Sequence, residues 1–189
     1  MSIQTISENA NIITPAVLLT ALKTSQTPHL DQYSKGLTVL LKTFVDEKHY
    51  LFAEKADDWQ DAIRMSCKSL EADGTLDATY AEEIIACVEK HGPYIVLVPG
   101  IALPHSMEGA KGVFKTAIGF MKLEQPVSFD DSDPEKSATV FFTLASENHE
   151  AHLANMQQLF TMLTDDDLVE ELFLVKGPED LLRLDEKYS

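Results

Sequence analysis

The sequence predicts an α/β fold in which helices pack in layers against a sheet. Short apolar runs at 94–98 and 138–145 are rich in Val, Ile and Phe, a composition typical of buried strands. Longer segments place apolar residues every three or four positions, as amphipathic helices do. Because the two kinds of segment alternate along the chain, a layered α/β domain is favoured over an all-helical or all-β one.

The first part of the chain is predicted to be an N-terminal helical extension, residues 1–35, followed by a domain at 36–189. Thr14-Pro15 is typical of a helix start, with a capping residue followed by proline at the first helical position. A second helix begins near Asp31 and carries an apolar face as far as Val45. The extension could pack on its own domain or on another subunit, and the sequence leaves both open.

The next elements are predicted from their boundaries. Residues 49–53 are expected to form an edge strand, and Asp57 with Gln60 a weak capping box before a helix that ends at 72–74. Asp77 or Thr79 begins another helix, which Gly92-Pro93 ends. Its spacing directs one set of residues inward (Tyr80, Ile84, Cys87, Val88) and another outward (Glu82, Glu83, Glu89).

The second half continues the alternation. The run at 94–98 is expected to be the central strand, with further strands at 113–122 and 138–145 and a turn at Gln125-Pro126. Residues 146–148 are predicted to cap a helix over 149–163. The three aspartates at 165–167 should cap the next helix, because negative charge suits the positive helix end. The Gly177-Pro178 pair precedes the last helix.

Composition and charge exclude several classes of function. The formal net charge of −16 disfavours nucleic acid and anionic membrane surfaces as partners, because both would repel the chain. No run approaches the ~20 apolar residues of a membrane span. The two cysteines are expected to be buried thiols in a cytoplasmic protein. No cluster has zinc-ligand spacing, and we expect neither a metal nor a cofactor.

The segment 94–106 contains the most informative motif, in which an apolar run, Pro99-Gly100 and a second short apolar run lead to Pro104-His105-Ser106. Pro104 has a fixed φ and favours an extended residue before it, so His105 should point in a defined direction. Small residues after it leave room for an approaching group.

This segment resembles the phosphorylation motif of the IIA domains (EIIA, type 2) of the bacterial phosphoenolpyruvate-dependent sugar phosphotransferase system. The match, Gly-Ile-Ala-Leu-Pro-His over 100–105, lies in the mannitol/fructose class, and residues 92–100 are most similar to the ascorbate-type branch. Two positions depart from the family. Ser106 stands where glycine is usual, and Lys90 lies where many mannitol-type members carry an upstream arginine.

The resemblance implies a three-layer sandwich with a mixed sheet of about five strands between helices. It also implies a phosphotransferase: His105 takes a phosphoryl group from a small histidine-containing carrier (HPr) and passes it to a cysteine of a IIB component, which serves a IIC membrane permease. Imidazole suits this task because it is a neutral nucleophile near pH 7.

A second histidine of this family lies at the start of the helix after the third core strand. His152 matches it best, and His149, one turn earlier, is the competing candidate. Positive charge and free N–H groups at a helix N-terminus suit a phosphate. The remaining histidines, His29, His49 and His91, are expected to have surface or packing roles.

Two alternatives remain open at the level of sequence. One is a regulatory module of the same family, whose phosphorylation state controls a protein partner instead of sugar uptake. The other is an interaction domain without phosphorylation, because a fold does not fix a function. The presence of Pro104-His105 weighs against the second.

Overall fold

Five strands form one mixed sheet at the centre of the computed structural model, which describes residues 40–107 and 109–188. In spatial order they are β1 (Tyr50–Ala53), β4 (Ala117–Ser128), β5 (Ser137–Ala145), β3 (Gly100–Ala102) and β2 (Val96–Val98). The outer pair β1–β4 and the pair β3–β5 are parallel, whereas β4–β5 and β2–β3 are antiparallel. The mixed five-stranded sheet is therefore confirmed.

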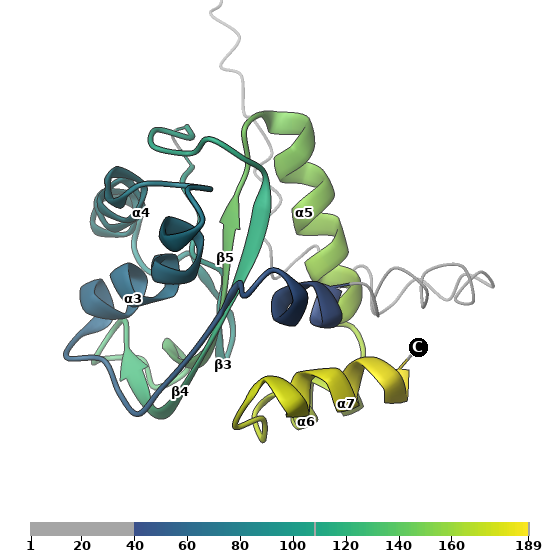
Figure 1. The fold of residues 1–189 in the computed structure, drawn as a ribbon. Helices are drawn as coiled ribbons and strands as arrows, with labels where there is room; N and C mark the ends of the chain where they lie inside the picture. Colours follow the sequence, from purple (N-terminus) through teal and green to yellow (C-terminus); the bar gives the residue numbers. More distant parts are fainter. Residues whose placement is uncertain (1–39, 108, 189) are drawn as a thin grey trace, which may run out of the picture.

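Helices cover both faces of this sheet (Figure 1). On one face lie α3 (Trp59–Ala72) and α4 (Ala78–His91). On the other lie α5 (His149–Met162), α6 (Asp166–Leu172), α7 (Pro178–Tyr188) and a short helix at 40–46, dark blue in the figure. The predicted three-layer α/β sandwich is confirmed.

The two faces of the sheet carry separate hydrophobic cores because successive side chains of a strand point to opposite sides. Phe120 and Phe142 belong to the core under α5, and their neighbours Met121 and Phe141 belong to the core under α3 and α4. Phe44, from the helix at 40–46, stacks on Phe120 with ring centroids 5.7 Å apart. Each such fully buried side chain stabilises the fold by about 1.5–3 kcal/mol.

Short polar side chains begin the helices, as the sequence predicts, with one correction. Asp77, Asn148 and Asp165 cap α4, α5 and α6. For α3 the cap is Asp58 and not Asp57, because the Asp58 carboxylate accepts from the backbone N–H of Asp61. The predicted capping box of Asp57 with Gln60 is therefore wrong by one position.

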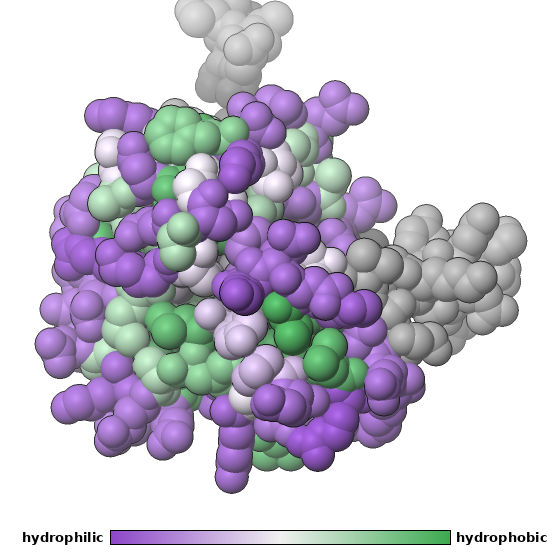
Figure 2. Space-filling model, in the orientation of Figure 1, coloured by the Kyte–Doolittle hydropathy of each residue, from purple (hydrophilic) through white to green (hydrophobic). Residues whose placement is uncertain are grey.

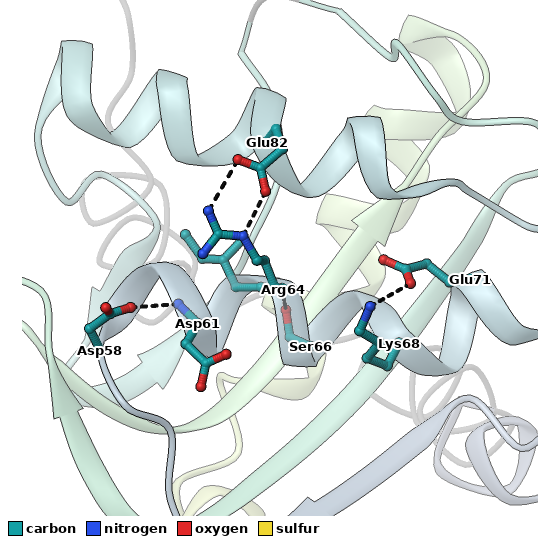
Figure 3. A network of polar contacts seen from close by, with 8 residues as sticks. Asp58, Asp61, Arg64, Ser66, Lys68, Glu71 and Glu82 are labelled. Carbon is teal, nitrogen blue, oxygen red and sulfur yellow. Dashed lines mark hydrogen bonds and ion pairs between the residues drawn. The ribbon is translucent and has the colours of Figure 1, made fainter.

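Polar contacts lie on the outward surfaces of α3 and α4, and one of them joins the two helices (Figure 3). The Arg64 guanidinium donates to both carboxylate oxygens of Glu82, at 2.6 and 3.2 Å, and Lys68 pairs with Glu71 at 2.8 Å. Arg64 and Glu82 are exposed, so water screens their attraction and the pair adds little to stability. Glu82 therefore lies where the helical spacing predicts it, on the outer surface.

Two strand predictions are wrong. Of the run at 94–98 only Val96–Val98 forms a strand, the short edge strand β2, and the middle position in the sheet belongs to β5. The strand predicted at 113–122 begins later, at Ala117, and continues through Gln125-Pro126 to Ser128. A register shift between Lys122 and Val127 accommodates that dipeptide, so it makes an irregularity within β4 and not a turn.

The remaining expectations concern the chain as a whole. The predicted helical extension, 1–35, lies outside the described residues. Cys67 and Cys87 are buried, as predicted, and both are free thiols.

Across 40–107 and 109–188, every helix is too short or too polar to cross a membrane. Hydrophilic side chains cover most of the face shown in Figure 2, which suits the strongly charged composition.

Candidate active site

The backbone around His105 is held in place where the chain leaves β3. Gly100 makes the turn from β2 possible: its φ of +89° suits glycine, and a Cβ there would lie 2.7 Å from the Phe173 ring. The chain then stays bonded to its neighbours past the end of β3. Three hydrogen bonds do this: Leu103 N–H to Ile95 O (2.8 Å), Leu144 N–H to Pro104 O (3.0 Å), and Tyr94 O–H to His105 O.

The imidazole of His105 is oriented by its own backbone. Its Nδ1 lies 2.7 Å from the carbonyl oxygen of Leu103. Because a carbonyl only accepts hydrogen bonds, Nδ1 must carry the proton and Nε2 holds the lone pair. No described residue hydrogen-bonds to Nε2, and Nε2 is not among the buried, unpartnered polar atoms of the described chain, so it keeps contact with solvent.

Burial keeps this ring neutral. His105 is 6% exposed, and its pKa is lowered to about 4. Loss of solvent is the main cause and the nearby His152 adds to it, while the bond to Leu103 opposes the shift. The rings of His105 and Tyr94 pack edge to face, with their centroids 5.1 Å apart and their planes at 88°. At neutral pH the side chain is therefore an uncharged nucleophile with one available nitrogen.

His152 lies beside His105, with ring centroids 5.4 Å apart. It belongs to the first turn of α5, whose cap Asn148 accepts from the N–H of Ala151. His152 is half-buried, and burial, followed by the charge of His149, lowers its pKa. His149 is exposed. The structure therefore brings His105 and His152 together, at a helix end that favours anions.

The other histidines have different surroundings. His49 is buried, and its Nε2 lies 3.0 Å from a carboxylate oxygen of Asp73, so it is a packing residue. His91 is exposed at the end of α4, and His29 lies outside the described residues. A cavity of about 540 Å³ next to β1 and β4 is lined by neither His105 nor His152. In the described chain, no three His, Cys, Asp or Glu side chains are grouped so that they could hold a metal ion.

Three further residues, Tyr94, Tyr80 and Glu83, contact the His105 loop, and sequence reasoning gave none of them a role at the site. Tyr94 binds His105 O, and Tyr80 O–H donates to Leu144 O (2.6 Å) while lying 3.4 Å from Ser106 N. Ser106 O–H donates to Glu83 at 2.5 Å. The prediction that Glu83 faces solvent is wrong, since it is half-buried against this loop. The one signal in the sequence was the serine after the histidine.

This geometry defines a class of protein. A neutral imidazole with a fixed tautomer, one available nitrogen and an adjacent helix N-terminus can accept an electrophilic anionic group and release it again. Such an arrangement has the features that a histidine group carrier needs.

Comparison with known proteins identifies the carrier. The family model described as "phosphoenolpyruvate-dependent sugar phosphotransferase system, EIIA 2" matches residues 43–187, and the chain belongs to this family. The ascorbate-specific EIIA component of Shigella boydii serotype 4 (strain Sb227) is 28% identical over 148 residues, which are 77% of this chain and 94% of that protein. The resemblance recognised from the motif is confirmed.

Two solved structures from Escherichia coli show the same fold. The mannitol-specific cryptic phosphotransferase enzyme IIA is 26% identical with a TM-score of 0.68, covering 78% of this chain and 98% of that one. The mannitol enzyme IIA in complex with phosphorylated enzyme IIB is 25% identical with a TM-score of 0.62, covering 74% and 95%. The protein is a phosphotransferase component of sugar transport, and these comparisons do not favour the regulatory alternative.

Proposed function

We propose that His105 accepts a phosphoryl group on Nε2 from an HPr-like phosphocarrier and passes it to a cysteine of a IIB component, in the cytoplasm. The observation that supports this most strongly is the bond from Nδ1–H to Leu103 O, which leaves Nε2 as the one nucleophilic nitrogen. The domain at 36–189 would carry the whole site, and the role of residues 1–35 stays open.

Each transfer exchanges one bond to phosphorus for another. The Nε2 lone pair attacks phosphorus, the bond between phosphorus and the carrier breaks, and its electron pair returns to the carrier. In the second step the thiolate of the IIB cysteine attacks phosphorus, the P–N bond breaks, and its electron pair returns to Nε2. Such transfers depend mainly on positioning and electrostatics. A pKa of about 4 suits the first step, because the ring needs no deprotonation at pH 7.

His152 has a supporting role in this proposal. Its ring lies next to that of His105, and it can donate a hydrogen bond to a phosphoryl oxygen once the group arrives. The N-terminus of α5 adds roughly half a positive charge at the same place. Together they would spread the negative charge that develops on the phosphoryl oxygens during transfer.

The partners follow from charge and from the relatives. A net charge of −16 suits partners with basic surfaces and would speed their encounter with the chain. The solved complex of a related enzyme IIA with phosphorylated enzyme IIB supports a IIB acceptor. A IIC permease would then bind the sugar. The likeness to an ascorbate-specific component supports ascorbate, or a similar acid or polyol, as that substrate.

The test is phosphate uptake by the full chain incubated with phosphoenolpyruvate and the two upstream phosphotransferase proteins. Intact-mass spectrometry should show one added phosphoryl group on the wild type and none on His105→Ala, whose circular dichroism should stay unchanged. Retention of the phosphoryl group by a folded His105→Ala variant would overturn the assignment. His91→Ala, a change at an exposed histidine, is the matched control and should keep full uptake.

A further inference from the structure

Ser106, the residue after the proposed phosphoryl carrier, is tied to the helix α4. It is 8% exposed, and its hydroxyl donates to Oε1 of Glu83 at 2.5 Å, a short hydrogen bond to a carboxylate. Its backbone N–H lies 3.4 Å from the Tyr80 hydroxyl, and its Oγ lies 3.7 Å from the Cys87 sulfur. All three partners belong to α4, so this helix fixes the chain on the C-terminal side of His105.

The ring of His105 is sensitive to any movement of this loop. Because Nδ1 bonds to the carbonyl of Leu103, two residues back in the same loop, the ring direction depends on the backbone torsions over 103–105, and Ser106 holds the chain directly after them. The N-terminal side of the loop is held by the sheet, through Ile95 and Leu144. The side-chain bond of Ser106 to Glu83 provides a corresponding constraint on the other side.

We propose that Ser106 and Glu83 are positioning residues for phosphoryl transfer at His105, acting through the Ser106 Oγ–Glu83 Oε1 hydrogen bond. This inference rests on the proposed function. A glycine at 106 would lack the bond and would give the loop more torsional freedom. The ring would then occupy the attacking geometry for a smaller fraction of the time, which slows the chemical step and leaves docking of the carrier unchanged.

The structure separates this role from a general contribution to folding. Glu83 is half-buried, whereas its neighbours Ile84 and Ile85 provide the apolar contacts of α4 with the core. The preceding residue, Glu82, is a matched control: it is also a carboxylate on α4, but it points to the outer surface and pairs with Arg64 (Figure 3). Neutralising either glutamate changes the helix and the net charge equally, and only one change reaches the His105 loop.

The experiment measures steady-state phosphoryl transfer from the phosphorylated HPr-like carrier to the full chain and on to a IIB acceptor. Ser106→Ala should lower kcat about tenfold, with KM for the carrier changed by less than about twofold. Glu83→Gln keeps an accepting amide oxygen but loses the charge that strengthens the bond, so it should lower kcat by a smaller factor. The double variant should be no slower than Ser106→Ala, because that change already removes the bond that Glu83→Gln weakens. Ser106→Thr keeps the hydroxyl and should retain activity, and Glu82→Gln should match the wild type.

A second readout works even if a variant is less stable. Nitrogen-15 NMR of the histidine rings should show His105 as the Nδ1–H tautomer in the wild type, and a mixture of ring states in Ser106→Ala and Glu83→Gln. Wild-type rates in both single variants would overturn the proposal. So would a double variant about a hundredfold slower, or an equal loss in Glu82→Gln. Failure of the wild type itself to accept phosphate would instead overturn the proposed function.

Discussion

His49 and His105 are equally buried, each 6% exposed, yet their surroundings differ in one respect. The ring of His49, just before β1, has a carboxylate partner, with Nε2 3.0 Å from Asp73. The ring of His105, just after β3, has a backbone carbonyl partner at Nδ1 and leaves Nε2 without a hydrogen bond from the described residues. The comparison shows that two equally buried histidines differ in which ring nitrogen stays available, and that the hydrogen-bond partner decides this.

The partner decides which ring nitrogen is available. The Asp73 carboxylate occupies Nε2 of His49, so this nitrogen is not free for nucleophilic attack. Burial opposes ionisation of Asp73, but hydrogen bonds from Thr75 and His49 outweigh it and hold the Asp73 pKa at about 2. At His105 the hydrogen bond to Leu103 O offsets burial only in part, so the pKa falls to about 4 and the ring stays neutral.

The largest expected difference between the two regions is in how each makes the free energy of unfolding depend on pH. The unfolded chain binds a proton at His105 near pH 6.5, and the folded chain only near pH 4. Stability is therefore lost as the pH falls through this window, by up to about 3 kcal/mol, and His152 shifts it in the same direction. Asp73 contributes only below about pH 4. Urea unfolding at several pH values measures the loss.

The control for this window is His105→Gln, which removes the titrating ring. Its stability should change much less between pH 6.5 and 4.5 than that of the wild type. If the two proteins lost stability in parallel, the folded His105 would not have a depressed pKa, and its difference from His49 would disappear.

A smaller effect, on the rate of phosphoryl uptake, is expected from a change at His152, the histidine beside His105. His152→Ala should accept phosphate more slowly, by about tenfold, because the hydrogen bond to the phosphoryl oxygen and its help in the transition state are lost. His149→Ala, a change at an exposed residue one turn earlier in α5, should react at the wild-type rate. Quench-flow with the phosphorylated carrier measures both. Equal rates for His152→Ala and the wild type would reassign His152 to packing.

The smallest effect is expected in the His49 region. Asp73→Asn weakens the partner of His49 and the hydrogen bond to Thr75 N–H, and should cost about 1 kcal/mol of unfolding free energy. Phosphoryl uptake should not change, because this region lies outside the site. Asp46→Asn, which removes an exposed pairing with Lys42, is the control and should cost less. A transfer defect in Asp73→Asn would contradict the separation of the two regions.

The sequence predicted the elements better than their places in the sheet. Helix starts at Asp77 and Asn148 follow from local capping chemistry, which the chain displays directly. The edge position of β2 and the continuation of β4 through Pro126 depend on long-range pairing, which short-range periodicity does not encode.

The same contrast holds for the site. His105 and His152 were named from the motif and from its resemblance to a family, and the structure places them side by side. Glu83 could not be found this way, because on helical spacing it belongs to the outer face of α4. Only the path of the loop after β3 brings Ser106 against it.

The most direct test of the central claim is to locate the phosphoryl group on the wild-type chain. After phosphorylation through the upstream proteins, nitrogen-15 and phosphorus-31 NMR of the full chain should show a single phosphohistidine. It should be bonded at Nε2 of His105, with Nδ1 still protonated. Phosphate at Nδ1 of His105, on His152, or on a residue other than histidine would contradict the account.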